Sequence, residues 1–247
     1  MSTTSGTSVF NLDLNEIIEE AYERCGIEVR TGYEHRTARR SLNLMLTEWA
    51  NRGINLWTIE QGTIAMTTGT ITYALPVDTV DLIEQVIRTQ TGIPQTDINI
   101  SRISVDTYAT IPNKNAQGRP IQVWINRQSG QIYPSGGRPE GTNPTTGVLP
   151  PSINVWPCPD QDNYYTFVYW RLRRMQDAGT GTSIQDIPFR LLNCMVAGLA
   201  YYLSIKIPDA AQRVPVLKQM YDDQLVLALD EDREKAPLRI APRQLFY

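Results

Sequence analysis

A single run of mostly apolar residues, Asp186–Ile207, restricts most strongly what this chain can fold into. Its apolar side chains fall on every side of the helix that the run would form, and a helix that is apolar all round is a buried one. The run is too short, with two polar side chains near its start, to be a membrane span. Asp186 can cap the first turn, Pro188 is tolerated there, and Pro208 stops the helix. We therefore expect the central helix of a small bundle.

Further helices are predicted on both sides of this run. The first two lie at about 13–25 and 33–52, and each opens with the spacing of a capping box, in which two residues satisfy each other's free backbone N–H groups. The two pairs are Asp13 with Glu16 and Thr31 with Glu34. A last helix is predicted from residue 209 to about 234, and it either starts near Val214 or kinks at Pro215.

The pattern changes from helical to strand-like at Trp57 and returns to helical after Arg174. Residues 57–76 are typical of a β-hairpin that turns near Gly69. A short helical turn is expected at 105–110. Further strands are predicted at 80–89, 121–127, 153–156 and 164–172.

The order of these elements predicts an α+β fold, in which N- and C-terminal helix pairs form one helical bundle and an antiparallel β domain is inserted between them. The expected parts are 1–56 and 174–235 for the bundle, 57–173 for the β domain, and 236–247 for an extended tail. Within the β domain, Ser129–Ser152 is so rich in glycine and proline that it cannot hold a regular element. Its length predicts a functional or disordered loop.

Few residues suggest catalysis or metal binding. The only histidine, His35, has no local partner for a catalytic pair, and clustered Cys and His with zinc-ligand spacing are absent. There is no glycine-rich phosphate loop of a common pattern. The three cysteines are far apart and odd in number, and the N-terminus has no signal-peptide pattern, which favours a reducing, soluble compartment. We therefore expect no catalytic residues, no cofactor and no metal.

Three arginines on the second predicted helix, Arg36, Arg39 and Arg40, leave three interpretations open. They are a nucleic-acid stripe, an exposed face that pairs with acidic neighbours, or a protein–protein contact. The chain as a whole has a formal net charge of −3 and a pI of about 5.3, whereas a protein that grips DNA phosphates is usually basic. The acidic neighbours are Glu19, Glu20, Glu23 and Glu34.

The C-terminal tail is the second candidate site. It has no acidic residue after Glu234, and its apolar side chains alternate with basic ones. A frayed terminus is expected to be polar, so this composition favours docking by strand addition or pocket insertion, either on another chain or on the body of the same chain. The candidate partner-binding residues are Leu238, Arg239, Ile240, Arg243, Leu245, Phe246 and Tyr247.

Residues 38–65, ARRSLNLMLTEWANRGINLWTIEQGTIA, resemble the head-to-tail adaptor family of short-tailed bacteriophages, the tail tubular protein A-like connectors that bind the portal. In that family a helix of the form A-R-R-x-L-N ends in R-G and leads to a tryptophan and a glutamate-containing strand. This is a packing and turn signature, not a catalytic one. The matching positions are Ala38, Arg39, Arg40, Leu42, Asn43, Arg52, Gly53, Trp57, Glu60 and Gly62.

The resemblance implies a structural virion protein at the head–tail junction, assembled in the host cytoplasm. Its implied partners are the portal protein, the tail nozzle protein and further copies of itself in a ring, usually twelve-fold. Genomic DNA would pass through the ring without sequence-specific binding, and no membrane is involved. The tail is then a candidate contact to the portal or to a neighbouring subunit, and the three arginines are candidates for an interface or a DNA-facing surface.

Two other functions compete with this interpretation. A glycan-cleaving virion enzyme that aids entry would need two carboxylates in unlike environments, placed within the β domain. A nucleic-acid-binding module would need a basic groove, which the acidic net charge disfavours.

Overall fold

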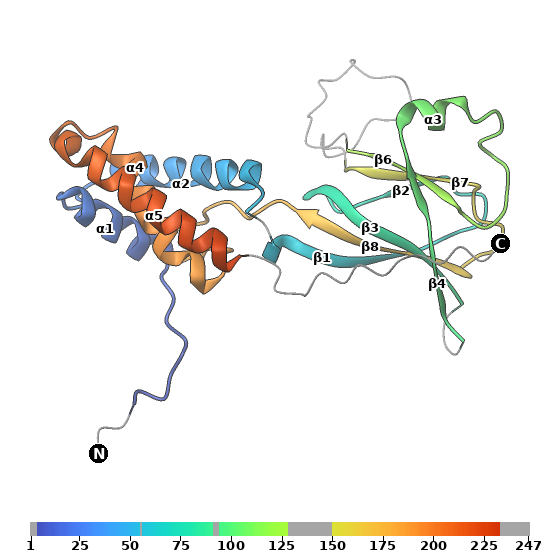
Figure 1. The fold of residues 1–247 in the computed structure, drawn as a ribbon, viewed down its shortest axis with the longest axis horizontal. Helices are drawn as coiled ribbons and strands as arrows, with labels where there is room; N and C mark the ends of the chain where they lie inside the picture. The colour runs from blue at the N-terminus through green and yellow to red at the C-terminus, as the bar shows by residue number, and fades with distance from the viewer. Residues whose placement is uncertain (1–3, 55, 91–93, 128–149, 233–247) are drawn as a thin grey trace. The chain divides into compact units, whose positions relative to one another are not determined.

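The computed structural model describes residues 4–54, 56–90, 94–127 and 150–232, and these form two compact units (Figure 1). The helical unit contains the chain up to residue 56 and again from 175, and the β unit runs from 57 to 174. Helices dominate the first unit and two sheets the second, so the expected α+β class is confirmed.

The N-terminal part of the helical unit consists of α1 (Leu14–Cys25) and α2 (Gly32–Arg52). Both capping boxes predicted from the sequence are confirmed. The side chains of Asp13 and Thr31 accept hydrogen bonds from the backbone N–H groups of Glu16 and Glu34. The two glutamate carboxylates in turn accept from the backbone N–H groups of the caps. The two helices end at Gly26 and Gly53, whose φ angles of 81° and 80° are left-handed. Residues with a Cβ adopt this conformation only at an energetic cost.

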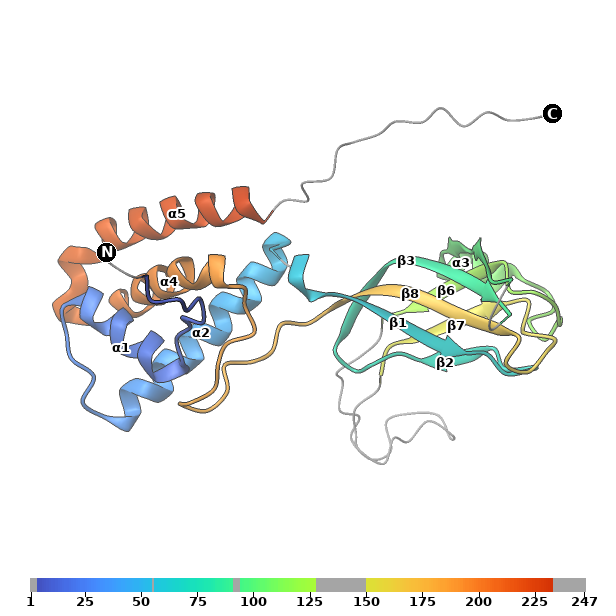
Figure 2. The same cartoon turned by 90° about the horizontal axis from the view of Figure 1, so that it is seen from below.

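The expected central helix is α4 (Leu192–Ser204), which follows a 3-10 turn, η2 (Phe189–Leu191). It packs against α1, α2 and α5 (Figure 2). All of its side chains are buried except Asn193, Tyr201 and Tyr202. No helix in the described part of the chain is long and apolar enough to span a membrane.

The prediction that Asp186 caps this helix is wrong. The Asp186 carboxylate accepts a hydrogen bond from the backbone N–H of Gln176 at 3.2 Å, and the α-helix begins only at Leu192. Pro188 explains the delay, because its own backbone is extended with ψ of 150° and a proline also keeps the residue before it out of the helical region.

The last described helix is α5 (Val214–Glu231), which follows a 3-10 segment, η3 (Pro208–Arg213). Pro215 lies in its first turn, so the helix starts at the proline instead of kinking there. The apolar side chains on the inner side of α5 are buried, whereas Met220 is 42% exposed on its outer side. The buried side chains are Leu217, Tyr221, Leu225 and Ala228.

The β unit contains two four-stranded sheets. In order across the first sheet lie β1 (Ile59–Ala65), β8 (Tyr165–Arg173), β3 (Thr79–Thr89) and β4 (Thr96–Asn99). Across the second lie β2 (Thr72–Ala74), β7 (Ser152–Trp156), β6 (Gln122–Asn126) and β5 (Ser101–Ile103). Two short helical segments complete the unit, η1 (Leu56–Thr58) and α3 (Val105–Thr110).

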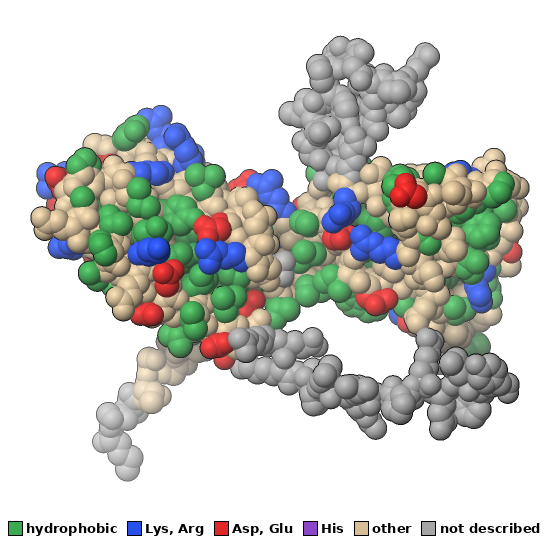
Figure 3. All heavy atoms as spheres, turned by 45° about the horizontal axis from the view of Figure 1, so that its top comes forward, with side chains coloured by type: hydrophobic (Ala, Val, Ile, Leu, Met, Phe, Trp, Pro, Cys, Tyr) green, Lys and Arg blue, Asp and Glu red, His purple; other side chains and the backbone are tan. Residues whose placement is uncertain are grey.

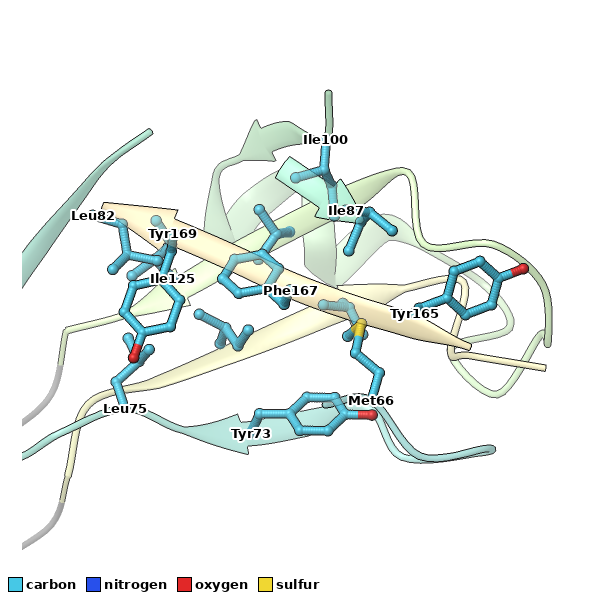
Figure 4. Packing of buried hydrophobic residues seen from close by; sticks show 13 residues of the cluster. Met66, Tyr73, Leu75, Leu82, Ile87, Ile100, Ile125, Tyr165, Phe167 and Tyr169 are labelled. Atoms are coloured by element: carbon cyan, nitrogen blue, oxygen red, sulfur yellow. The ribbon is translucent and has the colours of Figure 1, made fainter. Parts of the chain in front are cut away.

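Apolar side chains from both sheets meet in one core (Figure 4). Phe167 on β8 is fully buried at its centre, and its ring lies 5.7 Å from that of Tyr169, measured between ring centroids. The same core takes in Met66, which directly follows β1, and Tyr73 on β2. The two sheets therefore form a sandwich with a shared interior.

Two details of the predicted β domain are wrong. Residues 57–76 turn at Gly69, where φ is 71°, but they do not form a hairpin. Instead β1 pairs with β8 and β2 pairs with β7, so the turn carries the chain from one sheet to the other. The domain is also not wholly antiparallel, because β5 pairs with β6 in parallel after the crossover through α3.

Candidate interaction surfaces of the helical unit

The three arginines singled out from the sequence lie together on one exposed side of α2. Arg36, Arg39 and Arg40 are spaced by three and four residues, which places them next to each other on a helix surface. Arg39 donates a hydrogen bond to the carbonyl oxygen of Gly179 at 3.5 Å. Within the described residues, Arg36 and Arg40 form no ion pair or hydrogen bond through their side chains. We call these three arginines the basic face.

Two of the acidic neighbours expected to neutralise the basic face have partners elsewhere. The Glu34 carboxylate accepts backbone N–H bonds from Arg30 at 2.7 Å and Thr31 at 2.8 Å, and these bonds hold its pKa below the usual value. Glu20 pairs with Arg24 on its own helix at 2.8 Å. Among the described residues, none of the three arginines forms an ion pair with these acids.

A second charged surface lies on α1 and was not predicted as a site. Four glutamates, two of them adjacent and the others three or four residues away, lie next to each other on the helix surface, and we call them the acidic face. They line a groove of about 710 Å³ whose other wall is largely apolar. The acidic face consists of Glu16, Glu19, Glu20 and Glu23. The apolar lining consists of Phe10, Leu12, Phe189, Leu192 and Val196.

Two aromatic side chains of the apolar lining are open to solvent. The side chain of Phe10 is 68% exposed and that of Phe189 is 72% exposed. Large aromatic side chains rarely remain this exposed on the same surface unless a partner covers them. The acidic face could have been predicted from the spacing of its glutamates in the sequence. The apolar lining could not, because it depends on how α4 packs against α1.

The cations beside the groove have partners of their own. The Arg24 guanidinium also donates to the Asn193 side chain at 3.4 Å, and Asn193 donates to Gln224 at 2.7 Å, which ties α1 to α4 and α5. Arg190 forms an ion pair with the buried carboxylate of Asp232. Neither cation compensates Glu19 or Glu23, which have no side-chain partner in the described part of the chain, and the groove is therefore electronegative.

The predicted partner-binding residues of the C-terminal tail, Leu238 to Tyr247, lie outside the described residues, as does most of the predicted loop at 129–152. The structure does fix where the described chain stops. Asp232 follows the end of α5 and is held by Arg190, which also lines the groove. The last described residue therefore lies next to a residue of the groove lining.

His35 and Cys25 are two side chains of the helical unit that could carry catalytic or metal-binding chemistry. His35 lies at a small hollow with Leu14, Ile18 and Arg36, and no described group of three or more His, Cys, Asp or Glu side chains has the arrangement of a metal site. Burial raises the pKa of Cys25 to about 11, so this thiol stays neutral, and it donates a hydrogen bond to the carbonyl oxygen of Ala200.

The shifted carboxylates of the β unit are those of ion pairs. Asp97 accepts two hydrogen bonds from Arg88, at 2.8 and 2.9 Å, and they lower its pKa. The hydrogen bond from Arg171 likewise lowers the pKa of Asp78. A general acid for glycan cleavage needs a raised pKa, whereas the pKa values of these two carboxyl groups are lowered. On the side of the molecule seen in Figure 3, positive, negative and apolar side chains alternate over both units.

A family model described as SU10 adaptor protein matches residues 13–241. The matched range begins at the cap of α1 and takes in both units, the acidic face and the basic face. No curated protein matches the chain.

Proposed function

Because the chain belongs to the SU10 adaptor protein family, a family of phage head-to-tail adaptors, we propose that copies of it form a ring beneath the portal. The ring extends the DNA channel and presents the docking surface for the tail nozzle. The observation that carries this proposal is the family match over nearly the whole chain. Membership by itself makes the protein a structural adaptor of the virion, and the ring, its twelve-fold copy number and its named neighbours are the proposal.

Exposed apolar side chains on α5 support a role in assembly. Val216 (60% exposed), Met220 (42%) and Leu227 (62%) are spaced by four and seven residues, so they lie along one line of the helix that no described residue covers. Val226 (58% exposed) lies to one side of this line. An exposed apolar stripe of this kind is typical of a protein–protein contact.

The charge of the chain suits a channel through which DNA slides. The formal net charge is −3, so the ring as a whole repels the phosphate backbone and gains little from counterion release. DNA would then pass without being held and without its sequence being read.

The tail, Leu238 to Tyr247, is proposed as an arm that binds the portal, with a neighbouring adaptor copy as the second partner. Each apolar side chain that fills a pocket on the partner contributes about 1.5–3 kcal/mol, and a ring repeats that contribution in every copy. A chain truncated after Lys235 should keep its melting temperature and lose portal binding. If it unfolds, the tail belongs to the core. If it binds portal with unchanged affinity, the arm is not the contact.

The direct test of the ring is electron microscopy of the purified protein, alone and mixed with portal. Closed rings that cap the portal are expected. A protein that stays monomeric in both samples, at concentrations well above those of assembling virions, would contradict the proposal.

The alternative of a glycan-cleaving enzyme is tested separately. Asp97→Asn or Asp160→Asn should leave infectivity unchanged, since a structural adaptor needs no general acid. A reproducible glycan-cleaving rate that either substitution abolishes would establish the enzyme instead.

A further inference from the structure

We propose that neighbouring copies are joined by the basic face of α2 in one copy, seated in the acidic groove between α1 and α4 of the next. This inference rests on the proposed ring and adds the two surfaces that close it. Both surfaces lie within the helical unit.

The groove requires an occupant that is both basic and apolar. Glu19 and Glu23 supply two carboxylates with no side-chain partner among the described residues, and the exposed rings of Phe10 and Phe189 supply the apolar part. An apolar partner alone would leave the carboxylates facing a less polar surface, and a small cation alone would leave the rings exposed.

The outer side of α2 has this combined chemistry. Tyr33 is 69% exposed and Leu44 is 56% exposed, and they stand at the two ends of the line that runs through Arg36 and Arg40. These positions are separated by three and four residues, so their side chains follow one stripe along the helix. A helix that presents such a stripe is suited to lie in a groove, with its apolar side chains as anchors.

The spacing of the charges matches as well. The acidic face repeats at steps of three, one and three residues from Glu16 to Glu23, and the basic face repeats at steps of three and one from Arg36 to Arg40. Two helices that lie side by side therefore present opposite charges at the same intervals. Complementary potentials of this kind favour the correct register and disfavour contacts between like faces.

The two surfaces are also distinct, as a ring requires. The hollow beside the basic face and the acidic groove share no lining residue. The basic face borders residues 178–179, to which Arg39 and Asn43 are hydrogen-bonded, whereas the groove is bordered by α4 and α5. A contact between two different patches is heterologous, and repeated heterologous contacts generate a ring when the rotation closes.

The experiment is reciprocal charge reversal in the full-length chain. One variant carries Glu19→Arg with Glu23→Arg, and the other carries Arg36→Glu with Arg40→Glu. Either variant places like charges across the contact, so the concentration needed for half-assembly should rise by at least about tenfold in sedimentation velocity. An equimolar mixture of the two variants restores opposite charges at every contact and should assemble again, as should a chain carrying all four substitutions.

Folding of the variants is checked by circular dichroism, and all four substituted side chains are on the helix surface. Glu84→Arg with Asp106→Arg is the matched control, because it changes the net charge as much as the first variant at exposed positions in the β unit, outside both faces and outside α5. The control should assemble like the wild type.

Several results would overturn the proposal. If the wild type forms rings and both reversed variants do so at the same concentration, the faces are not the contact, although the ring stands. If the variants fail and their mixture fails too, the charges do not meet each other. If Arg36→Glu with Arg40→Glu assembles normally and only loses retention on DNA at low salt, the basic face meets DNA. If truncation after Lys235 alone abolishes the ring, the tail and not α2 fills the groove. A wild type that never assembles contradicts the ring as well.

Discussion

The hydrogen bond between Trp49 on α2 and Tyr221 on α5 allows a quantitative test of how the helical unit holds together. The indole Nε1–H donates to the Tyr221 hydroxyl at 2.9 Å, and Trp49 is fully buried while Tyr221 is 3% exposed. Burial raises the pKa of Tyr221 to about 12, so the phenol is neutral and the bond is present throughout the ordinary pH range.

Tyr221→Phe keeps the ring and removes the acceptor. The indole N–H is then left buried without a partner, which costs about 1–3 kcal/mol of the free energy of unfolding. For a protein of this size, the melting temperature falls by roughly 2–4 °C for each kcal/mol. The transition is followed by circular dichroism at the helical band, where the helical unit contributes most of the signal.

A matched control is Tyr201→Phe. The Tyr201 ring stacks on that of Tyr221 with centroids 6.1 Å apart, but its hydroxyl has no hydrogen-bond partner among the described residues. The same chemical change should therefore leave the melting temperature almost unaltered. A Tyr221→Phe protein that melts with the wild type and its control would refute the assigned role of this bond. A double-mutant cycle with Trp49→Phe then measures the coupling, which should be about 0.5–3 kcal/mol.

Two other predictions follow from burial and charge. Leu199→Asp places an unpaired carboxylate in the fully buried side of α4, at a cost of several kcal/mol against a typical stability of roughly 5–15, so a soluble, cooperatively melting variant would show that α4 is not central. The pKa of Asp78 is lower in the folded protein than in the unfolded chain, so its ionised carboxylate stabilises the β unit at pH values above the pKa of the unfolded chain. This stabilisation is lost as the pH falls through the pKa of Asp78 in the folded protein. In Asp78→Asn, the melting temperature should therefore fall less steeply as the pH is lowered below about 4. If the melting temperature depends on pH as in the wild type, the ion pair with Arg171 does not contribute to stability.

The features that were predicted correctly from the sequence are local ones. The capping boxes at Asp13 and Thr31 need only residues three positions away, so their spacing was sufficient. The burial of α4 followed from its composition, because a helix that is apolar on every side is stable only when other elements cover it. The start of α5 at Pro215 was one of two alternatives that proline chemistry allows.

The features that were missed depend on distant parts of the chain. The turn at Gly69 could be predicted from the sequence, but the partner of β1 is β8, which lies more than a hundred residues further along the chain. The predicted hairpin was therefore wrong. The acidic face was seen only as a set of partners for the arginines. Its groove exists because Phe189 and Leu192 lie beside α1, and no spacing within α1 encodes that contact.

The pairing of β1 with β8 has a further consequence for folding. These two strands carry the chain out of the helical unit and back, and their ladder begins at the pair Ile59 and Leu172. Once the β unit has folded, it holds the start of β1 and the end of β8 together as a cross-link would. The chain between α2 and α4 then behaves as a much shorter loop. Shortening the connection from roughly 140 residues to an effective loop of roughly 25 saves loop-closure entropy on the order of 1.5 kcal/mol. A substitution in the β core, such as Phe167→Ala, would therefore weaken the helical unit without touching any residue in it.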